Sequence, residues 1–441
     1  MAEAASEIEG SVTSVGIRSV LRNDHFRRLW LSQVFSATAG NMVNFVLILE
    51  LYEKTSSSFL VSVLVVLTVL PTILFSSLAG IYADTFNRKY LLVFSNLVRS
   101  ILVVTLSFFP AEPWLFLVFG FLLSSMSQFF GPAQSATIPH LVQPRQLFSA
   151  NTLFMFTTYS TVLFGYTMAG PALHYLGDLR TASLLVVAFT ASAMLNLQLP
   201  FFRDHLERQW GRSYLDRAFK NLAVDFREGM NIVRKSRIIL TLLLLVSILF
   251  AVERALVGLL PSLAGTVFQF SVEEISYFLI APAGIGAILA VALGRHVSKR
   301  VRTFSLVVFG LLLVGCALLL IPLSGLVESL AVGHADVTVF AALLSFASGV
   351  ASILVIVAGQ TLLHERTPSD THGRIFGGLI SLMNAIGLPL ILLVGLLAGA
   401  LSLQAIVFCL GVLLVIAGLF AVFSLRADVE AVRPLPRAEN L

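Results

Sequence analysis

The sequence contains little charge. Asp, Glu, Lys and Arg make up only 12% of its 441 residues, whereas 57% of the residues are hydrophobic. This composition excludes a water-soluble globular protein and predicts a membrane protein. The net charge of +5 does not indicate nucleic acid binding, because the basic residues lie in short loops between apolar runs, where anionic lipid headgroups would meet them.

Cysteine and catalytic motifs are scarce as well. The two cysteines, Cys316 and Cys409, each fall inside an apolar run, which argues against a disulfide framework or a thiolate metal site. No lysine follows a glycine, so a phosphate-binding loop is absent and ATP hydrolysis by this chain is not expected. The short motifs of zinc hydrolases, thiol redox enzymes and serine hydrolases are also missing. We therefore expect no enzyme, no cofactor and no metal site.

Long apolar runs, by contrast, are abundant. A helix of about 20 apolar residues crosses the roughly 30 Å hydrocarbon core of a bilayer. The sequence predicts an all-α integral membrane protein with twelve such spans, at 29–52, 59–79, 90–109, 114–138, 147–173, 181–200, 238–268, 275–293, 303–327, 337–363, 374–400 and 403–425. The longest polar stretch between two spans, 201–237, separates six from six. We therefore predict an N-terminal half at 1–200, a linker at 201–237, a C-terminal half at 238–425 and a tail at 426–441.

Basic residues indicate the orientation of these spans. Nearly all of the 29 Lys and Arg residues fall on the side that holds both termini and the linker; the exceptions are Lys54, Arg180, Arg99 and Arg254. This asymmetry predicts an inner-membrane protein with both termini in the cytoplasm. Within the linker, apolar residues recur every three or four positions and predict an amphipathic helix, which either ties the two halves together at the membrane surface or acts as a regulatory helix.

A short motif lies between the second and third spans. From Gly80 to Lys89 the chain reads GIYADTFNRK, which resembles the G-x-L-A-D-R-x-G-R-[RK] element of the major facilitator superfamily. Asn87 stands where the motif has its second glycine, and we expect Asn87 to adopt the left-handed backbone conformation there. Asp84 is expected to accept hydrogen bonds from Arg88 or from a helix N-terminus. The resemblance implies a gate formed by Gly80, Asp84, Arg88 and Lys89; the alternative is a plain basic turn.

A second stretch resembles one branch of that superfamily. Residues from Pro132 to Asn151 fit the P-A-x-x-A-x-x-P-x-L-V…L-x-x-A-N pattern of the macrolide-efflux and enterobactin-exporter-like branch, and Asn96 with Arg99 resembles its D-x-x-R. The resemblance implies two pseudosymmetric six-helix halves, alternating access, and export of an amphipathic small molecule such as a drug, a macrolide or a siderophore-like compound. A lysophospholipid flippase and a non-transporting sensor or scaffold remain the alternatives.

Partners follow from the same resemblance. We expect a small-molecule substrate, membrane lipids, no nucleic acid and a monomeric chain. Drug/proton antiporters of the superfamily carry an arginine in the fourth span, but 114–138 contains no charged residue. Coupling to protons is therefore left open.

Polar residues at membrane depth are candidates for the substrate or proton pathway, because an unpartnered polar group in hydrocarbon is unfavourable. Asn41 and Asn44 share one helix face by their spacing, and either line the path or bond a neighbouring helix; Asn384 is a further candidate. Glu253 and Arg254 are adjacent, and neighbours on a helix point about 100° apart, so they cannot neutralise each other side by side. Glu253 is predicted to carry protons; the alternative is an ion pair at the outer end of the span.

Overall fold

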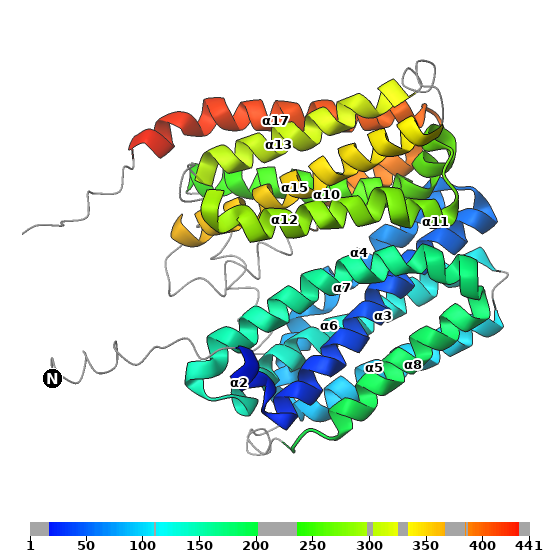
Figure 1. Cartoon of the computed structure of the whole chain (residues 1–441), viewed down its shortest axis with the longest axis vertical. Coiled ribbons are helices and arrows are strands. Elements are labelled where there is room, and N and C mark those ends of the chain that lie inside the picture. Colours follow the sequence, from blue (N-terminus) through cyan, green and yellow to red (C-terminus); the bar gives the residue numbers. More distant parts are fainter. Residues whose placement is uncertain are drawn as a thin grey trace, which may run out of the picture. The chain divides into compact units, whose positions relative to one another are not determined.

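The computed structural model describes residues 17–109, 112–201, 236–297, 303–324, 334–366, 384 and 387–431. All regular structure within these ranges is helical, and none of the described residues forms a β-strand. The protein is therefore an all-α protein, as its apolar runs predict (Figure 1). Both termini and the predicted linker helix at 201–237 lie largely outside the described residues.

Ten helices in the described ranges are long and apolar enough to cross a membrane. They are α3 (Asp24–Thr55), α4 (Ser58–Thr85), α5 (Arg88–Phe108), α6 (Pro113–Leu141), α8 (Asp178–Leu197), α10 (Arg237–Leu263) with its π-helical extension Ala264–Phe268, α12 (Ala281–Val297) with the preceding π-helical Ile275–Ile280, α13 (Thr303–Leu320), α15 (His334–Arg366) and α17 (Leu403–Ala431). The helix α7 (Leu147–Leu176) coincides with the predicted fifth span but is less apolar, and α2 (Ile17–Leu21) is short.

The predicted eleventh span, 374–400, lies mostly outside the described residues. Its described part is Asn384 and the apolar helix Gly387–Leu397. The total of twelve spans therefore stays a prediction, while a multi-pass helical membrane protein is established by the ten helices.

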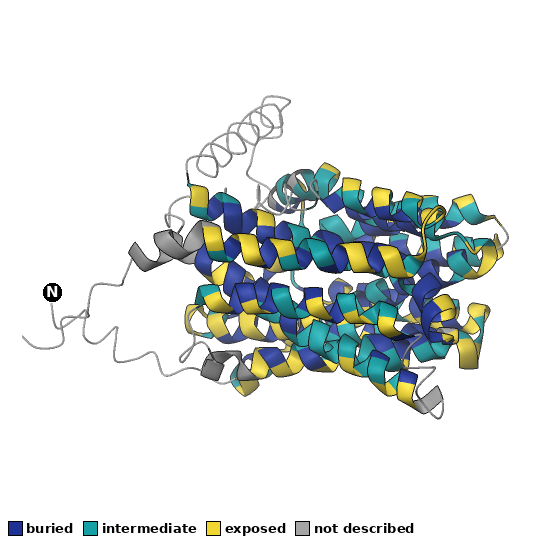
Figure 2. Ribbon diagram, turned by 90° about the horizontal axis from the view of Figure 1, so that it is seen from above, coloured by how far each residue is buried: buried dark blue, intermediate teal, exposed yellow. Residues whose placement is uncertain are grey.

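Burial alternates along these helices as expected for a protein in lipid. Figure 2 shows buried and exposed residues interleaved on successive turns of the same helix. Many of the exposed side chains are large and apolar, among them Phe108, Phe164 and Phe423. In water such side chains would form an unfavourable surface, whereas hydrocarbon tails cover them without loss.

Contacts divide the chain into two compact units. The first comprises Met1–Lys54 and Leu67–Ala218, and the second comprises Thr55–Val66 and Phe219–Leu441. The division passes through the continuous helix α4. The second division, at Ala218/Phe219, falls within residues 202–235, which are not described. The predicted boundaries at 200/201, 237/238 and 425/426 therefore stay predictions.

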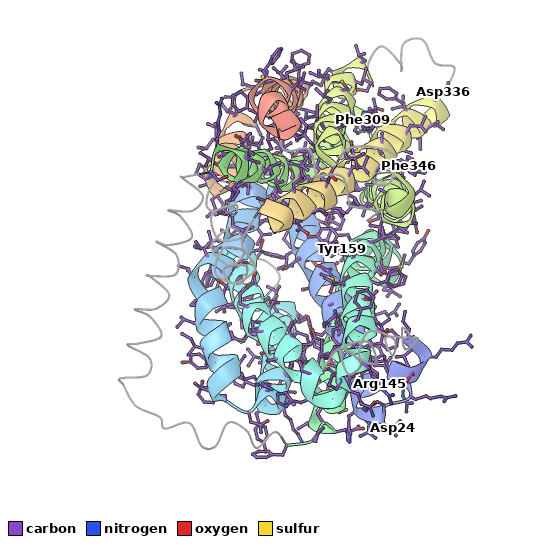
Figure 3. All side chains as sticks on the ribbon, turned by 90° about the vertical axis from the view of Figure 1, so that its left-hand side faces the viewer. Asp24, Arg145, Tyr159, Phe309, Asp336 and Phe346 are labelled. Atoms are coloured by element: carbon purple, nitrogen blue, oxygen red, sulfur yellow. The ribbon has the colours of Figure 1, made fainter. Side chains whose placement is uncertain are left out.

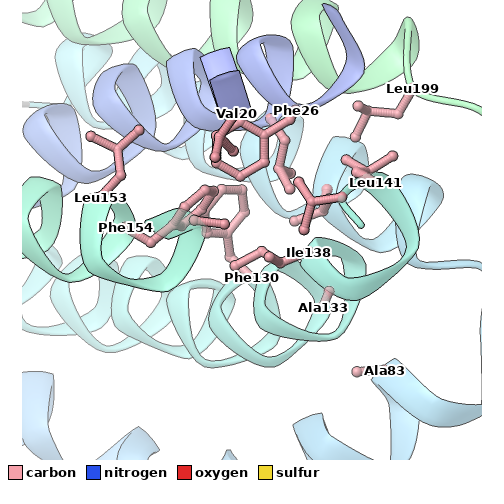
Figure 4. Packing of buried hydrophobic residues seen from close by; sticks show 14 residues of the cluster. Val20, Phe26, Ala83, Phe130, Ala133, Ile138, Leu141, Leu153, Phe154 and Leu199 are labelled. Carbon is pink, nitrogen blue, oxygen red and sulfur yellow. The ribbon is translucent and has the colours of Figure 1, made fainter. Parts of the chain in front are cut away.

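Within the first unit, α5 packs against α6 and α8. A buried polar network joins α3, α5 and α8: the amide of Asn96 accepts a hydrogen bond from Ser36 at 2.8 Å and donates one to Ser192 at 3.0 Å, and Ser192 also bonds Ser32. An apolar cluster packs residues of α2, α3, α6 and α7 together (Figure 4). It consists of Val20, Phe26, Leu29, Ala83, Leu92, Phe130, Ala133, Ile138, Leu141, Val142, Ala150, Leu153, Phe154 and Leu199.

Within the second unit, glycines allow close helix crossings. A Cβ on Gly349 of α15 would clash with the backbone of Ala283 on α12, and a Cβ on Gly286 would clash with the carbonyl of Phe346, which is labelled in Figure 3. The helices α13 and α17 meet in the same way, since a Cβ on Gly411 would lie 2.9 Å from the Gly315 carbonyl oxygen. Small residues at helix crossings are how membrane helices gain packing where no hydrophobic effect drives association.

Candidate functional site

The Gly80–Lys89 segment is more helical than the sequence predicts. The helix α4 continues to Thr85 and α5 begins at Arg88, so only two residues connect them. Asn87 has φ −63° and ψ 116°, and its side chain accepts a hydrogen bond from the Lys89 amide at 3.1 Å. The expected left-handed conformation at Asn87 is therefore wrong. An extended backbone is required because Asn87 is the N-cap of α5, where its side chain bonds an amide that the helix leaves unpaired.

Arg88 joins three helices of the first unit. Its buried guanidinium donates from Nη1 to the Ala136 carbonyl oxygen of α6 at 2.9 Å, and from Nε to the Ala83 carbonyl oxygen of α4 at 3.5 Å. A cation near the C-terminal end of a helix is stabilised by the partial negative charge of the carbonyl groups there. The two sequence motifs thus meet in space, because Arg88 belongs to the first and Ala136 to the second.

The remaining predicted gate residues differ in how far the structure describes them. Lys89 is half-buried. A Cβ on Gly80 would meet no atom within 4 Å, so packing does not demand glycine at this position. The side chain of Asp84 lies outside the described residues, and the gating role of this set stays a prediction.

Aromatic rings line α4 and α6 beside this segment. Phe75 of α4 contacts Phe121 and Phe129 of α6, with ring centroids 6.2 and 6.3 Å apart. Tyr82 packs edge-on against Phe129 at 5.7 Å and stacks on Phe86 at 5.0 Å. These contacts hold the second part of α4 to α6, since aromatic pairs add to the stabilisation that their buried area provides.

Asn41 and Asn44 are half-buried on α3. A Cβ on Gly165 of α7 would lie 2.7 Å from the Asn41 Cβ and 2.9 Å from the Met42 amide nitrogen, so α3 and α7 cross closely at Asn41. This position is compatible both with a lining role and with helix packing, and the two alternatives for these residues stay open.

Arg99 is a buried cation inside the first unit. Its guanidinium lies 5.0 Å from the ring centroid of Phe130 and 5.1 Å from that of Phe189, and Nε donates to the Ser95 carbonyl oxygen at 3.1 Å. Its Nη2 has no hydrogen-bond partner among the described residues. Two aromatic faces stabilise this charge through cation–π interactions.

Glu253 and Arg254 on α10 differ in exposure. Glu253 is half-buried and hydrogen-bonds the side chain of Ser352 on α15, whereas Arg254 is exposed. Asn384 is half-buried. No group of three His, Cys, Asp or Glu side chains that could hold a metal ion occurs in the described ranges.

The family is decided by a match along most of the sequence. The family model described as Major Facilitator Superfamily matches residues 29–377. The chain belongs to the Major Facilitator Superfamily. This confirms the predicted family, and it makes the protein a membrane transporter by membership.

Two relatives illustrate its place in the superfamily. Macrolide efflux protein A of Streptococcus pyogenes is 24% identical over 396 residues, which cover 83% of this chain and 88% of that protein. The uncharacterized MFS-type transporter YfiS of Bacillus subtilis is 26% identical over 348 residues, which cover 76% of this chain and 77% of that protein.

Solved structures of other superfamily members share the fold. An auto-inhibited POT family peptide transporter superposes with a TM-score of 0.68 at 12% identity, covering 95% of this chain and 99% of that one. The nucleoside transporter NupG superposes with a TM-score of 0.65 at 14% identity, covering 90% and 99%. At these identities the likeness shows the major facilitator fold alone.

Sequence reasoning missed two residues of this transporter that the structure brings into contact with its candidate residues. Ser352 bonds Glu253 across two helices, and Ala136 receives Arg88 through its backbone carbonyl. A serine within a span is common, and a carbonyl oxygen carries no sequence signal. Neither contact could have been found without the fold.

Proposed function

We propose that this transporter exports amphipathic small molecules of the macrolide type by alternating access. The observation that carries the proposal is the match to a macrolide efflux protein over 83% of this chain and 88% of that relative, which includes both sets of helices. A second protein of that name, from Enterococcus faecalis, is 23% identical over 350 residues. The motifs at Gly80–Lys89 and Pro132–Asn151 support the same assignment.

The gate is proposed to be the Gly80–Lys89 segment. Arg88 already joins the ends of α4 and α6 to the start of α5, so this segment holds three helices of the first unit in one arrangement. A second arrangement of the same helices would exchange these hydrogen bonds for others. Asp84 is proposed to supply the carboxylate that favours one of the two arrangements.

Glu253 is proposed to be the proton carrier. Its carboxyl group is half-buried on α10, hydrogen-bonds the Ser352 hydroxyl and interacts electrostatically with the exposed Arg254 beside it. A carboxyl group that bonds a hydroxyl can change protonation without leaving a buried cation unpaired, because Arg254 is exposed. The predicted span 114–138 contains no Asp, Glu, Lys or Arg, so it lacks the arginine found in drug/proton antiporters of the superfamily. Glu253 is proposed to take over the coupling role.

The test is transport of radiolabelled erythromycin into inside-out vesicles that contain the purified protein, with and without a proton gradient. We expect gradient-driven accumulation by the wild type and its loss in Glu253→Gln, with Ser352→Ala retaining part of it because the carboxyl group remains. A Glu253→Gln variant that keeps the full gradient-driven component would refute the proton carrier. A wild type that moves fluorescent lysophospholipid but no erythromycin would replace the exporter with a flippase.

A further inference from the structure

The helix α7 is long enough to cross a membrane but is more polar than the helices around it. It has 30 residues, which at 1.5 Å per residue span roughly 45 Å. Among the described helices, ten are apolar enough for a membrane span by their hydropathy, and α7 is not one of them. Polar residues at membrane depth face the interior of a helix bundle or a water-filled cavity.

One side of α7 is packed against α3. Thr157 accepts a hydrogen bond from the Trp30 indole nitrogen at 2.8 Å, and the Thr158 hydroxyl accepts one from the Gln33 side-chain amide at 2.9 Å. The buried Gly165 allows the close crossing of the two helices further along. This side of α7 therefore lies inside the first unit.

The opposite side of α7 is exposed and chemically mixed. Met155 and Phe156 are 66% and 63% exposed, and Tyr159, which is labelled in Figure 3, is 50% exposed. Asn151, one turn before Met155, is exposed as well. Met155 points about 200° away from the buried Thr157, because successive helical residues are about 100° apart. We call Asn151, Met155, Phe156 and Tyr159 the α7 face; their spacing of three and four residues places them on one side of the helix.

The α7 face places polar groups at membrane depth. Tyr159 lies roughly 18 Å along α7 from Leu147 at 1.5 Å per residue. Neither its hydroxyl nor the side-chain amide of Asn151 forms a hydrogen bond with another described residue. A hydroxyl or an amide that is moved from water into hydrocarbon without a hydrogen-bond partner is unfavourable. Water or a polar ligand therefore satisfies these two groups.

The helix α5 shows the contrasting pattern of a surface that lipid covers. Its serine, threonine and asparagine residues are all buried or half-buried. Its exposed residues are large and apolar or aromatic, and they recur every three or four positions: Tyr90, Phe94, Leu97, Ile101, Val104 and Phe108. The α7 face departs from this pattern, since Asn151 and Tyr159 are exposed among apolar neighbours.

We propose that the α7 face is a substrate-binding surface that lines a water-accessible passage. It binds amphipathic molecules that have a bulky apolar body and hydroxyl or amine groups along one edge. Met155 and Phe156 contact the apolar body, because a thioether adapts to irregular shapes and an aromatic ring offers a large contact area. Tyr159 and Asn151 bond the polar edge, since each side chain can donate and accept hydrogen bonds. The inference rests on the export function proposed above and adds the residues that recognise the substrate.

Cysteine labelling tests whether the α7 face meets water. Tyr159→Cys, Met155→Cys and Ile101→Cys are made separately in a protein that carries Cys316→Ala and Cys409→Ala. Ile101 is the matched control, because it is 62% exposed and lies roughly 20 Å from the start of α5. A negatively charged methanethiosulfonate reacts with the thiolate, which forms in water and not in hydrocarbon. We expect both α7 positions to react about tenfold faster than Ile101→Cys or more; equal rates would overturn the proposal by placing the α7 face in lipid.

Protection by substrate separates binding from exposure to water. Saturating erythromycin should slow the modification of Tyr159→Cys about fivefold or more in the same vesicles. If the wild type transports erythromycin but the drug leaves this rate unchanged, the α7 face is not the binding surface and the export function stands. If the wild type transports no erythromycin, the proposed function fails, and the rates at Tyr159 and Ile101 still decide whether the α7 face lines a water-accessible passage.

Removal of one hydroxyl provides the second arm. Tyr159→Phe should raise the KM for erythromycin about fivefold, the factor that one neutral hydrogen bond supplies, and should leave kcat unchanged. Tyr175→Phe is the matched control, because it makes the same substitution at a 69% exposed tyrosine beside the last residue of α7. This control should keep the KM and kcat of the wild type. Equal KM values for the two variants would exclude the Tyr159 hydroxyl from substrate recognition and overturn the proposed role of the α7 face.

Discussion

The crossing of α3 and α7 at Gly165 allows a quantitative prediction. A Cβ at this position would lie 2.7 Å from the Asn41 Cβ, 2.9 Å from the Met42 amide nitrogen and 2.9 Å from the Thr38 carbonyl oxygen. Carbon atoms pack best at about 3.5–4.0 Å, and two of the three neighbours are backbone atoms that cannot rotate away. Gly165→Ala therefore forces the two helices apart by several tenths of an ångström.

Two effects of this substitution oppose each other. Overpacking a well-packed interior destabilises by about 1–3 kcal/mol. Replacing glycine by alanine inside a helix stabilises by about 1 kcal/mol, because less backbone entropy is lost on folding. We expect a net destabilisation of about 0–2 kcal/mol in Gly165→Ala, together with reduced erythromycin transport if Asn41 lines the path.

Gly80 on α4 supplies the matched control. A Cβ there meets no atom within 4 Å, so Gly80→Ala carries the helix effect without the clash and should stabilise by about 0.5–1 kcal/mol. The measurement is equilibrium unfolding of both purified variants in mixed micelles with increasing sodium dodecyl sulfate. If Gly165→Ala proved as stable as Gly80→Ala, the close crossing of α3 and α7 would be refuted.

Three further predictions concern charge. Arg99→Met should unfold at a temperature no lower than the wild type, because a side chain of similar volume replaces a buried cation. Arg99→Ala should lower the free energy of unfolding by about 2–4 kcal/mol, because it leaves a cavity. A large loss of stability in the Met variant would show that the charge itself stabilises the first unit. Asp84→Asn should insert normally but transport erythromycin at least fivefold more slowly, since charge-assisted hydrogen bonds of about 1.5–3 kcal/mol each are removed from the gate; transport at the wild-type rate would exclude the gating role. Reporter fusions at Met1, in 201–237 and at Leu441 should all report the cytoplasm, and one fusion reporting the outside would reject the orientation assigned from the basic residues.

Hydropathy predicted where the helices lie but underestimated how far they extend. The predicted span 90–109 is observed as Arg88–Phe108, yet the predicted span 59–79 is observed as Ser58–Thr85. An apolar run indicates the part of a helix that lies in hydrocarbon. The helix itself continues for as long as its amide groups can hydrogen-bond the carbonyl groups four residues earlier. The polar residues of the Gly80–Lys89 motif therefore looked like a loop although most of them complete α4.

The candidate site was predicted less completely for a related reason. Adjacency predicts that Glu253 and Arg254 point about 100° apart, and in the structure Glu253 hydrogen-bonds Ser352. The identity of that partner could not be predicted, because about 100 residues separate the two in sequence and only the packing of α10 on α15 brings them together. Asn87 was misjudged because a motif comparison transferred the conformation of glycine to a residue that instead caps the next helix.

The aromatic partners of Arg99 also set an order for biosynthesis. When α5 leaves the ribosome, Arg99 has neither ring beside it, and a lone arginine at the bilayer centre is unfavourable by about 2.5–3.5 kcal/mol on insertion scales. Phe189 is translated about 90 residues later, a delay of roughly 5–20 s at typical elongation rates. During that interval α5 is expected to remain at the protein-lined translocon or at the bilayer surface. We expect the N-terminal helices to enter the lipid together once α8 has emerged, rather than one at a time.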